Sequence, residues 1–148
     1  MKQMLLAICA AAALACGGAS AQEASPVGLW ENIDDETGKP KALIRITQSN
    51  GELNGKIEKL FRAPDEEQNP TCDKCEGARK DQPIVGMTIL WGMKPEGAEY
   101  NGGQILDPAN GKVYKSKMSF ADSSKKLNVR GYIGMPMLGR TQSWVRAE

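Results

Sequence analysis

Histidine is missing from all 148 residues of the chain. Its absence removes the commonest general base, the commonest neutral metal ligand and the Ser–His and Cys–His nucleophile pairs. The chain also lacks a large net charge, since it has 19 basic and 18 acidic residues. This balance argues against a nucleic-acid partner. With 41% hydrophobic residues, 25% charged residues and 16 glycines, the chain is neither a collagen, a coiled coil nor a disordered tail.

Long hydrophobic runs are confined to the N-terminus. Lys2 precedes an apolar stretch at residues 4–15, and the small residues Ala19, Ser20 and Ala21 follow it. This pattern predicts a signal peptide over residues 1–21, removed on export, and one mature domain over residues 22–148 in the periplasm or outside the cell. The stretch is too short to cross a bilayer, which needs about 20 apolar residues. An alternative is lipoprotein processing, which would anchor the mature chain through Cys16.

Cysteine is scarce in the mature chain, which keeps only Cys72 and Cys75. An even pair in an oxidising compartment predicts one short-range disulfide. The spacing also fits a redox dithiol, but no helix pattern follows to lower a thiol pKa. A zinc site would have to complete its ligand set with carboxylates. The sequence therefore predicts a disulfide, and neither a metal nor a cofactor.

Short β-rich runs separated by turn residues fill the mature chain and predict an all-β domain. The runs are residues 27–33, 41–49, 52–62, 84–93, 99–107, 112–121, 126–134 and 140–145. Asn50-Gly51 is a strong signal for a tight antiparallel hairpin, since both turn positions need positive φ. Only the connection at residues 63–83 is long, and Cys72 and Cys75 pin it.

Glycines inside the predicted strands, such as Gly55, Gly103 and Gly131, permit the coiling and bends that closing a sheet requires. We therefore expect an eight-stranded antiparallel up-and-down barrel. Its interior is either filled by side chains or holds one small ligand. Alternation predicts that two sets of side chains face inward, Ala42, Ile44 and Ile46 on one strand and Tyr114, Ser116, Met118 and Phe120 on another. For residues 127–133 alternation does not say which set faces the barrel axis.

The opening Gly28-Leu29-Trp30 resembles the Gly-x-Trp of the lipocalins, whose tryptophan closes the barrel floor beneath an arginine from a late strand. A wider pattern resembles the DUF2147 family of uncharacterised exported bacterial proteins. Its motifs here are Gly102-Gly103-Gln104-Ile105-Leu106-Asp107-Pro108, Gly111-Lys112-Val113-Tyr114, Val129-Arg130-Gly131-Tyr132-Ile133-Gly134 and Gly139-Arg140-Thr141-Gln142-Ser143-Trp144. The resemblance implies a lipocalin/calycin-like barrel in the periplasm or outside the cell, and no agreed biochemical activity.

Candidate ligand-binding residues are the large side chains expected inside the barrel together with two arginines. These are Trp30, Tyr114, Met118, Phe120, Arg130, Tyr132 and Arg140. The aromatic residues either fill the core or line a pocket. Burying a guanidinium is costly unless it is paired or held against a ring, so we expect Arg130 or Arg140 to stack on Trp30. The other role open to these arginines is to hold a ligand carboxylate or phosphate.

Two further features bear on partners. Residues 112–148 hold 8 basic and 2 acidic residues, which fits either an anionic ligand or lipid surface or a solvated face. Met135-Pro136-Met137-Leu138 places apolar residues in a predicted hairpin loop. Folded over, this loop would cap one barrel mouth, which we expect; exposed, it would form a contact patch for a lipid surface or partner protein.

The sequence thus predicts an exported, non-catalytic protein that holds a small apolar or amphipathic molecule inside a β-barrel. The alternative is an interaction or scaffold protein of the cell envelope whose barrel is packed solid. An enzyme ranks third, because without histidine only carboxylates, tyrosine, lysine or the two thiols are available for proton transfer.

Overall fold

The computed structural model describes residues 24–148, and the expected signal peptide at residues 1–21, with Cys16, lies outside them. The described residues form eight strands and two short 3₁₀ helices. The strands are β1 (Gly28–Ile33), β2 (Pro40–Ser49), β3 (Glu52–Leu60), β4 (Thr88–Glu96), β5 (Glu99–Asp107), β6 (Lys112–Ala121), β7 (Lys126–Tyr132) and β8 (Gly139–Arg146), and the helices are η1 (Gly77–Arg79) and η2 (Pro136–Leu138).

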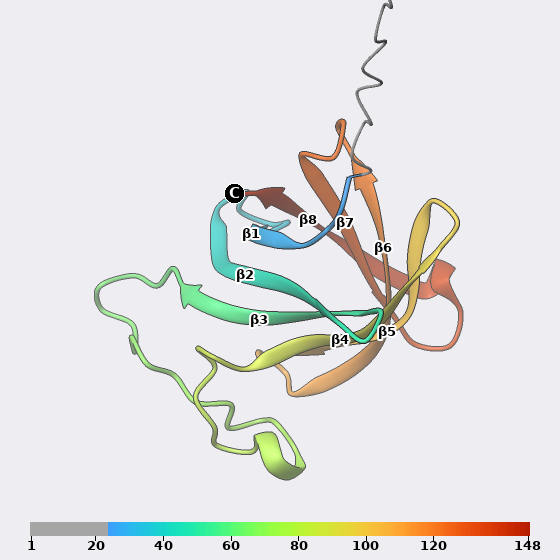
Figure 1. Cartoon of the computed structure of the whole chain (residues 1–148). Coiled ribbons are helices and arrows are strands. Elements are labelled where there is room, and N and C mark those ends of the chain that lie inside the picture. The colour runs from blue at the N-terminus through green and yellow to red at the C-terminus, as the bar shows by residue number, and fades with distance from the viewer. Residues whose placement is uncertain (1–23) are drawn as a thin grey trace, which may run out of the picture.

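Each strand pairs with the next one in the sequence, and β8 pairs with β1, so that the sheet closes into a barrel (Figure 1). All of these pairings are antiparallel. The predicted all-β, up-and-down barrel is confirmed. A closed sheet leaves no strand edge exposed for pairing with another chain.

The predicted strand bounds differ from the structure mainly at the fourth strand, which was expected to begin at residue 84 and begins at Thr88. Ile84 belongs to the preceding loop, where its N–H donates to Pro70 O over 3.1 Å. Gly86 then turns the chain with a φ of 93°, and its N–H donates to Ile57 O over 2.7 Å. The sequence pattern extended the predicted strand across this turn because Ile84 and Met87 are apolar. Both pack against the core although neither belongs to a strand.

The barrel interior follows the predicted alternation. Ala42, Ile44 and Ile46 of β2 are buried, as are Ser116 and Met118 of β6, which confirms the predicted inward sets. On β7 the structure decides what alternation left open, because Leu127 and Val129 are buried and Arg130 belongs to the opposite face. These side chains lie on the inner wall because successive residues of a strand point to opposite faces.

One end of the barrel is closed by Trp30, which has no exposed surface. Its indole N–H donates to Pro26 O over 2.8 Å, and its ring lies 6.5 Å from that of Phe120, centroid to centroid. The Arg146 guanidinium stacks on Trp30 at 4.3 Å and donates to Ser25 O over 2.8 Å. The hydrogen bonds pair the indole N–H of Trp30 and the guanidinium of Arg146, and the stacking places the cation of Arg146 on the Trp30 ring.

The expectation that Arg130 or Arg140 stacks on Trp30 is therefore wrong. Arg146 takes this position because it pairs directly with Trp30 in the β1–β8 ladder. The sequence pattern had ended the last strand at residue 145, one residue short of it, whereas β8 extends to Arg146.

The long β3–β4 connection folds into a loop beside the barrel, seen at the lower left of Figure 1. A disulfide joins Cys72 and Cys75, and both cysteines are buried. A backbone bridge between Thr71 and Pro83 closes the base of the loop. Arg79 of η1 stacks over the Trp91 ring at 4.4 Å, on the outer wall of β4. The predicted loop and its disulfide are both present, and the loop packs against the outer wall.

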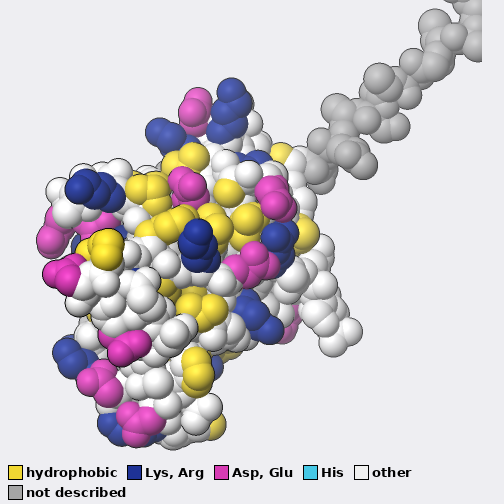
Figure 2. Space-filling model, turned by 90° about the vertical axis from the view of Figure 1, so that its left-hand side faces the viewer, with side chains coloured by type: hydrophobic (Ala, Val, Ile, Leu, Met, Phe, Trp, Pro, Cys, Tyr) yellow, Lys and Arg dark blue, Asp and Glu magenta, His cyan; other side chains and the backbone are white. Residues whose placement is uncertain are grey.

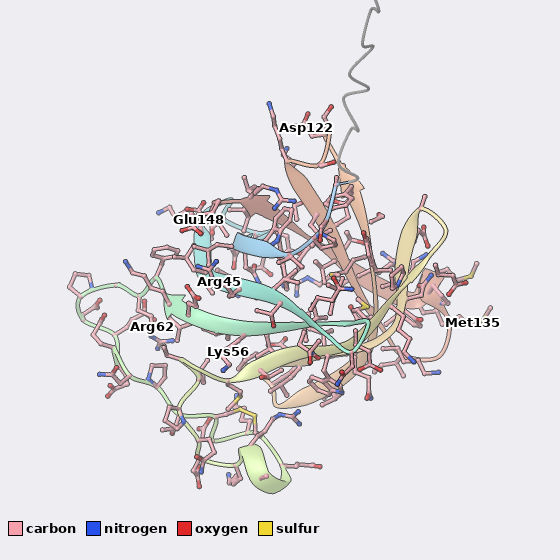
Figure 3. All side chains as sticks on the ribbon, viewed as in Figure 1. Arg45, Lys56, Arg62, Asp122, Met135 and Glu148 are labelled. Atoms are coloured by element: carbon pink, nitrogen blue, oxygen red, sulfur yellow. A yellow bond between two sulfur atoms is a disulfide. The ribbon has the colours of Figure 1, made fainter. Side chains whose placement is uncertain are left out.

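The outer surface on the side shown in Figure 2 carries acidic and basic side chains intermingled with apolar ones. On the outer surface Arg45 of β2 bonds to Glu58 over 2.6 Å and to Glu148 over 3.3 Å. Figure 3 shows Arg45 and Glu148 close together. Across residues 24–148 the structure contains no helix long and apolar enough to cross a membrane.

Candidate ligand-binding cavity

A cavity of about 640 Å³ occupies the end of the barrel opposite Trp30. At this end β1, β3, β5 and β7 finish and β2, β4, β6 and β8 begin, and the loops joining them surround an open mouth. Cavities of this size are typical of sites for small organic ligands. The barrel is therefore closed at one end and hollow at the other.

The deep wall of the cavity is apolar. Ile44 and Ile57 come from β2 and β3, Ile89 from β4, Ile105 from β5 and Val129 from β7. Gly131, the next residue inward on β7, leaves room between Ile105 and Tyr114: a methyl group at its Cα would lie 3.4 Å from Ile105 Cγ2. Because the glycine carries no side chain, the space beside it belongs to the cavity. An apolar group of a ligand would lose water contacts on entering such a wall, which favours binding.

A polar pair interrupts this wall where β1 and β8 meet. Asn32 Nδ2 donates to Gln142 Oε1 over 3.2 Å, and both side chains line the cavity. Asn32 Oδ1 is buried and has no hydrogen-bond partner among the described residues. A buried acceptor without a partner is costly, so a ligand hydroxyl or amide N–H that donates to it would be favoured.

Arg62 lies at the rim, two residues after the end of β3, and is labelled in Figure 3. Its Nη2 is 3.4 Å from Glu66 Oε2, which also lines the cavity. Its Nε is buried and has no hydrogen-bond acceptor within the part of the chain that the structure describes. A guanidinium with a buried, unpaired N–H beside an apolar cavity suits the carboxylate or phosphate of a bound molecule.

Arg140, at the start of β8, lines the mouth and pairs with Asp35 of the β1–β2 loop. Arg140 Nε donates to Asp35 Oδ2 over 2.6 Å, and Nη2 donates to the other carboxylate oxygen. This hydrogen bonding holds the pKa of Asp35 below its ordinary value of 3.8. The pair ties the β1–β2 loop to the strand that begins on the other side of the mouth.

Of the residues predicted to bind a ligand, Tyr114, Tyr132 and Arg140 line this cavity. The Tyr114 hydroxyl accepts a hydrogen bond from Asn110 Nδ2 over 3.0 Å, which joins β6 to the turn before it. The three residues come from β6, β7 and β8, and the structure brings them to one mouth.

Trp30, Met118, Phe120 and Arg130 lie elsewhere. Trp30, Met118 and Phe120 pack at the closed end, where Phe120 also meets the Tyr100 ring edge-on at 6.2 Å. Arg130 lies on the outer face, where Nη1 donates to Thr141 Oγ1 over 2.7 Å and Nε donates to Pro136 O. Alternation predicts which residues face inward but not how far along the barrel axis each one lies. The predicted set of ligand-binding residues therefore combined residues from both ends of the barrel.

Sequence reasoning missed Asn32, Arg62 and Gln142. Two of them carried a usable signal, because Asn32 is two residues after the inward Trp30 and Gln142 is two before the inward Trp144. Arg62 carried none, since it lies beyond the last residue of β3 and its side chain is placed by the loop that follows.

Comparison with known families settles the membership of the chain. The sequence profile described as "Uncharacterized protein conserved in bacteria (DUF2147)" matches residues 28–146, from the start of β1 to the end of β8. The chain belongs to the DUF2147 family. The match covers the closed end and the cavity of this DUF2147 protein alike.

A solved structure with the same architecture is titled "Protein HP1028 from the human pathogen Helicobacter pylori belongs to the lipocalin family". The DUF2147 barrel superimposes on it with a TM-score of 0.69 at 15% sequence identity, over 82% of either chain. At this identity the likeness establishes a lipocalin-like fold and leaves the ligand open. A comparison of the DUF2147 chain with curated proteins finds no match.

Proposed function

We propose that this protein is an exported, non-catalytic binder of a small apolar or amphipathic molecule, held in the cavity between the apolar barrel wall and the charged mouth. The observation that carries the proposal is the cavity itself, about 640 Å³ in volume, with isoleucines and a valine along its depth and arginines at its rim. Such a combination binds molecules with an apolar body and one polar end.

The polar end of the ligand is assigned to the rim. Arg62 offers a buried Nε without an acceptor among the described residues, whereas Arg140 is already paired with Asp35. An anionic head group would therefore form a stronger interaction with Arg62 than with Arg140, and Arg140 adds a second positive charge at the rim. A carboxylate and a phosphate share the chemistry that this rim recognises.

A barrel packed solid, as a scaffold protein would have, is disfavoured by the hollow end. An envelope protein remains the alternative partner, and the exposed β7–β8 connection is the surface it would use. Export to the periplasm or beyond belongs to the same proposal. N-terminal sequencing of the protein from its own envelope distinguishes cleavage after residue 21 from a lipid-modified Cys16.

Binding is tested with a dansyl-labelled fatty acid titrated into the mature chain, residues 22–148, with fluorescence as the readout. We expect saturable binding that falls by at least about tenfold in Ala42→Trp, because Ala42 lines the cavity and a large ring there occupies the space of the ligand. The control is Val113→Trp, which adds the same ring on the outer face of β6, where Val113 is 41% exposed. Equal affinity of the two variants would overturn the assignment of the cavity.

The head-group assignment is tested with Arg62→Ala. This substitution should weaken binding of the dansyl-labelled fatty acid by about tenfold, the equivalent of about 1.4 kcal/mol, since it removes a charge-assisted hydrogen bond. An uncharged probe, the dansyl amide of a long-chain amine, should bind wild type and Arg62→Ala alike. If Arg62→Ala weakened the binding of both probes to the same degree, Arg62 would shape the cavity without recognising the head group.

A further inference from the structure

The connection between β7 and β8, residues 133–138, exposes its apolar side chains to solvent. Met137 is 75% exposed, Leu138 71%, Ile133 65% and Met135 58%. The expectation that residues 135–138 fold over as a cap is wrong, since Met135, Met137 and Leu138 stay largely exposed and, of the three, Leu138 alone lines the mouth. Figure 3 shows Met135 at the outer edge of the molecule. A group of large apolar side chains left in water on a small protein indicates a contact surface.

The loop is held in this position by the barrel. Arg130 of β7 donates from Nε to Pro136 O, inside η2, and from Nη1 to Thr141 Oγ1 on β8. One guanidinium thus joins the turn to both strands that carry it. The apolar side chains are presented on a fixed turn, with a positive charge directly beside them.

The outer faces of β6 and β7, beside this loop, carry basic side chains. β6, β7 and β8 contain no aspartate or glutamate. Their basic residues are Lys112, Lys115, Lys117, Lys126, Arg130, Arg140 and Arg146. The outer wall beside the loop carries Lys115, Lys117 and Arg130, because Lys115 pairs with Tyr132 and Lys117 with Arg130 across β6 and β7. Lys117 Nζ lies 3.8 Å from Glu99 Oε2 of β5, so Lys115 and Arg130 supply the net positive charge of this wall.

The loop also forms part of the cavity rim, since Ile133 and Leu138 line the mouth. A surface that covers the loop therefore meets the mouth as well. An apolar turn flanked by lysine and arginine matches the boundary of an anionic bilayer, where apolar side chains enter the acyl region and cations meet the head groups.

We propose that the β7–β8 loop and the basic outer wall of β6 and β7 dock the protein on the surface of an anionic lipid bilayer, with the cavity mouth beside the membrane. Docking itself does not depend on ligand binding. Its consequence, that the cavity exchanges its ligand with the bilayer, rests on the proposed function.

The test is co-sedimentation of the mature chain with vesicles of phosphatidylglycerol and phosphatidylethanolamine, compared with vesicles of phosphatidylcholine alone. We expect binding to the anionic vesicles, with the bound fraction falling several-fold in 0.5 M NaCl, where the Debye length is only a few ångströms. Equal binding to both vesicles, or binding to neither, would overturn the proposal. A defined envelope protein captured through the loop, with no vesicle binding, would assign the surface to a protein partner.

Matched variants locate the surface. The double variant Met135→Ser/Met137→Ser should lose several-fold of the vesicle binding, and Val85→Ser, which changes a 39% exposed apolar residue on the β3–β4 loop, should not. Lys115→Glu should weaken binding to anionic vesicles, whereas Lys56→Glu on the exposed face of β3, labelled in Figure 3, should not. Unchanged binding in both test variants would show that the docking surface lies elsewhere.

One further measurement separates docking from ligand binding. The Met135→Ser/Met137→Ser variant changes no residue that lines the cavity, so it should still bind the dansyl-labelled fatty acid in solution with the affinity of the wild type. Loss of fatty-acid binding together with vesicle binding would mean that the loop serves the cavity alone, which contradicts the docking role. An unchanged thermal Tm confirms that the variant is folded.

Discussion

Arg146 and Trp30 show how one pair of side chains closes the barrel. The guanidinium lies 4.3 Å from the ring centroid and donates to Ser25 O and Val27 O, backbone acceptors that precede β1. Arg146 thereby joins the end of β8 to the entry of β1, the two strands whose pairing completes the closure. Resemblance to lipocalins predicted the type of contact from Gly28-Leu29-Trp30, and the last residue of β8 decided which arginine makes it.

Arg146→Ala should lower the free energy of unfolding by about 2 kcal/mol, since it removes a stacked cation and hydrogen bonds to backbone oxygens together. Arg79→Ala is the matched control, because Arg79 stacks over Trp91 at a similar 4.4 Å but on the outer wall. That change should cost less than about 1 kcal/mol. Urea unfolding followed by tryptophan fluorescence measures both, and equal costs would contradict a special role for the closed end.

Asp35 and Arg140 make stability at the mouth depend on pH. Hydrogen bonding from Arg140 lowers the pKa of Asp35 below its ordinary 3.8, so the folded state binds this proton less readily than the unfolded chain. The stabilisation is therefore present above pH 3.8 and is lost as the pH falls through the lower, folded-state pKa. Asp35→Asn should be less stable than wild type at pH 7, and the difference should shrink towards zero in strong acid.

A double-mutant cycle of Asp35→Asn with Arg140→Gln, read as Tm from pH 7 downward, checks this dependence. The coupling between the two residues should be favourable at pH 7 and should vanish as Asp35 takes up its proton. A coupling that persists undiminished in strong acid would show that the two residues interact through packing and not through charge.

At the scale of elements, the β3–β4 loop and the β5–β6 turn are fitted to each other at Gly111. A Cβ placed on Gly111 would lie 1.9 Å from Lys74 O, and its φ of 74° also favours glycine. Cys72 lies in the same contact, with Sγ 3.7 Å from Pro108 O. The disulfide loop is therefore packed against the turn, and a side chain at residue 111 would push it away.

Gly111→Ala should destabilise the protein more than Gly51→Ala. Gly51 has nearly the same φ, 75°, but nothing within 4 Å of its missing Cβ, so its substitution isolates the backbone strain. The additional loss in Tm for Gly111→Ala measures the contact with the loop. Limited proteolysis at residues 63–83 should accelerate only in Gly111→Ala, and equal losses for both variants would show that the loop does not depend on this contact.

The strands, the β3–β4 loop and its disulfide were predictable, whereas the place of the loop against the barrel was not, for a physical reason. Alternation, the Asn50-Gly51 turn and the glycines determine strands and closure because each acts over a few neighbouring residues. The place of the β3–β4 loop depends on contacts such as Lys74 with Gly111 and Arg79 with Trp91, which join distant parts of the sequence. Arg62, which the loop positions, was missed for the same reason.

At the scale of the whole molecule, the barrel divides its length between a packed end and a hollow one. Aromatic rings and methionine fill the end at Trp30, whereas branched aliphatic residues and Gly131 leave the other end open. Sequence alone predicted an interior that is either filled or hollow, and the structure combines the two. The basic outer wall of β6 and β7 and the exposed loop lie on the side of the hollow end, which joins the proposed binding site to the proposed docking surface.

The most direct test of the central claim is native mass spectrometry of the mature protein purified from its own envelope, followed by denaturation and analysis of what is released. We expect one small amphipathic molecule per protein, present in wild type and in Val113→Trp and absent from Ala42→Trp. Apoprotein alone in every preparation, or the same molecule retained by Ala42→Trp, would contradict ligand binding in this cavity.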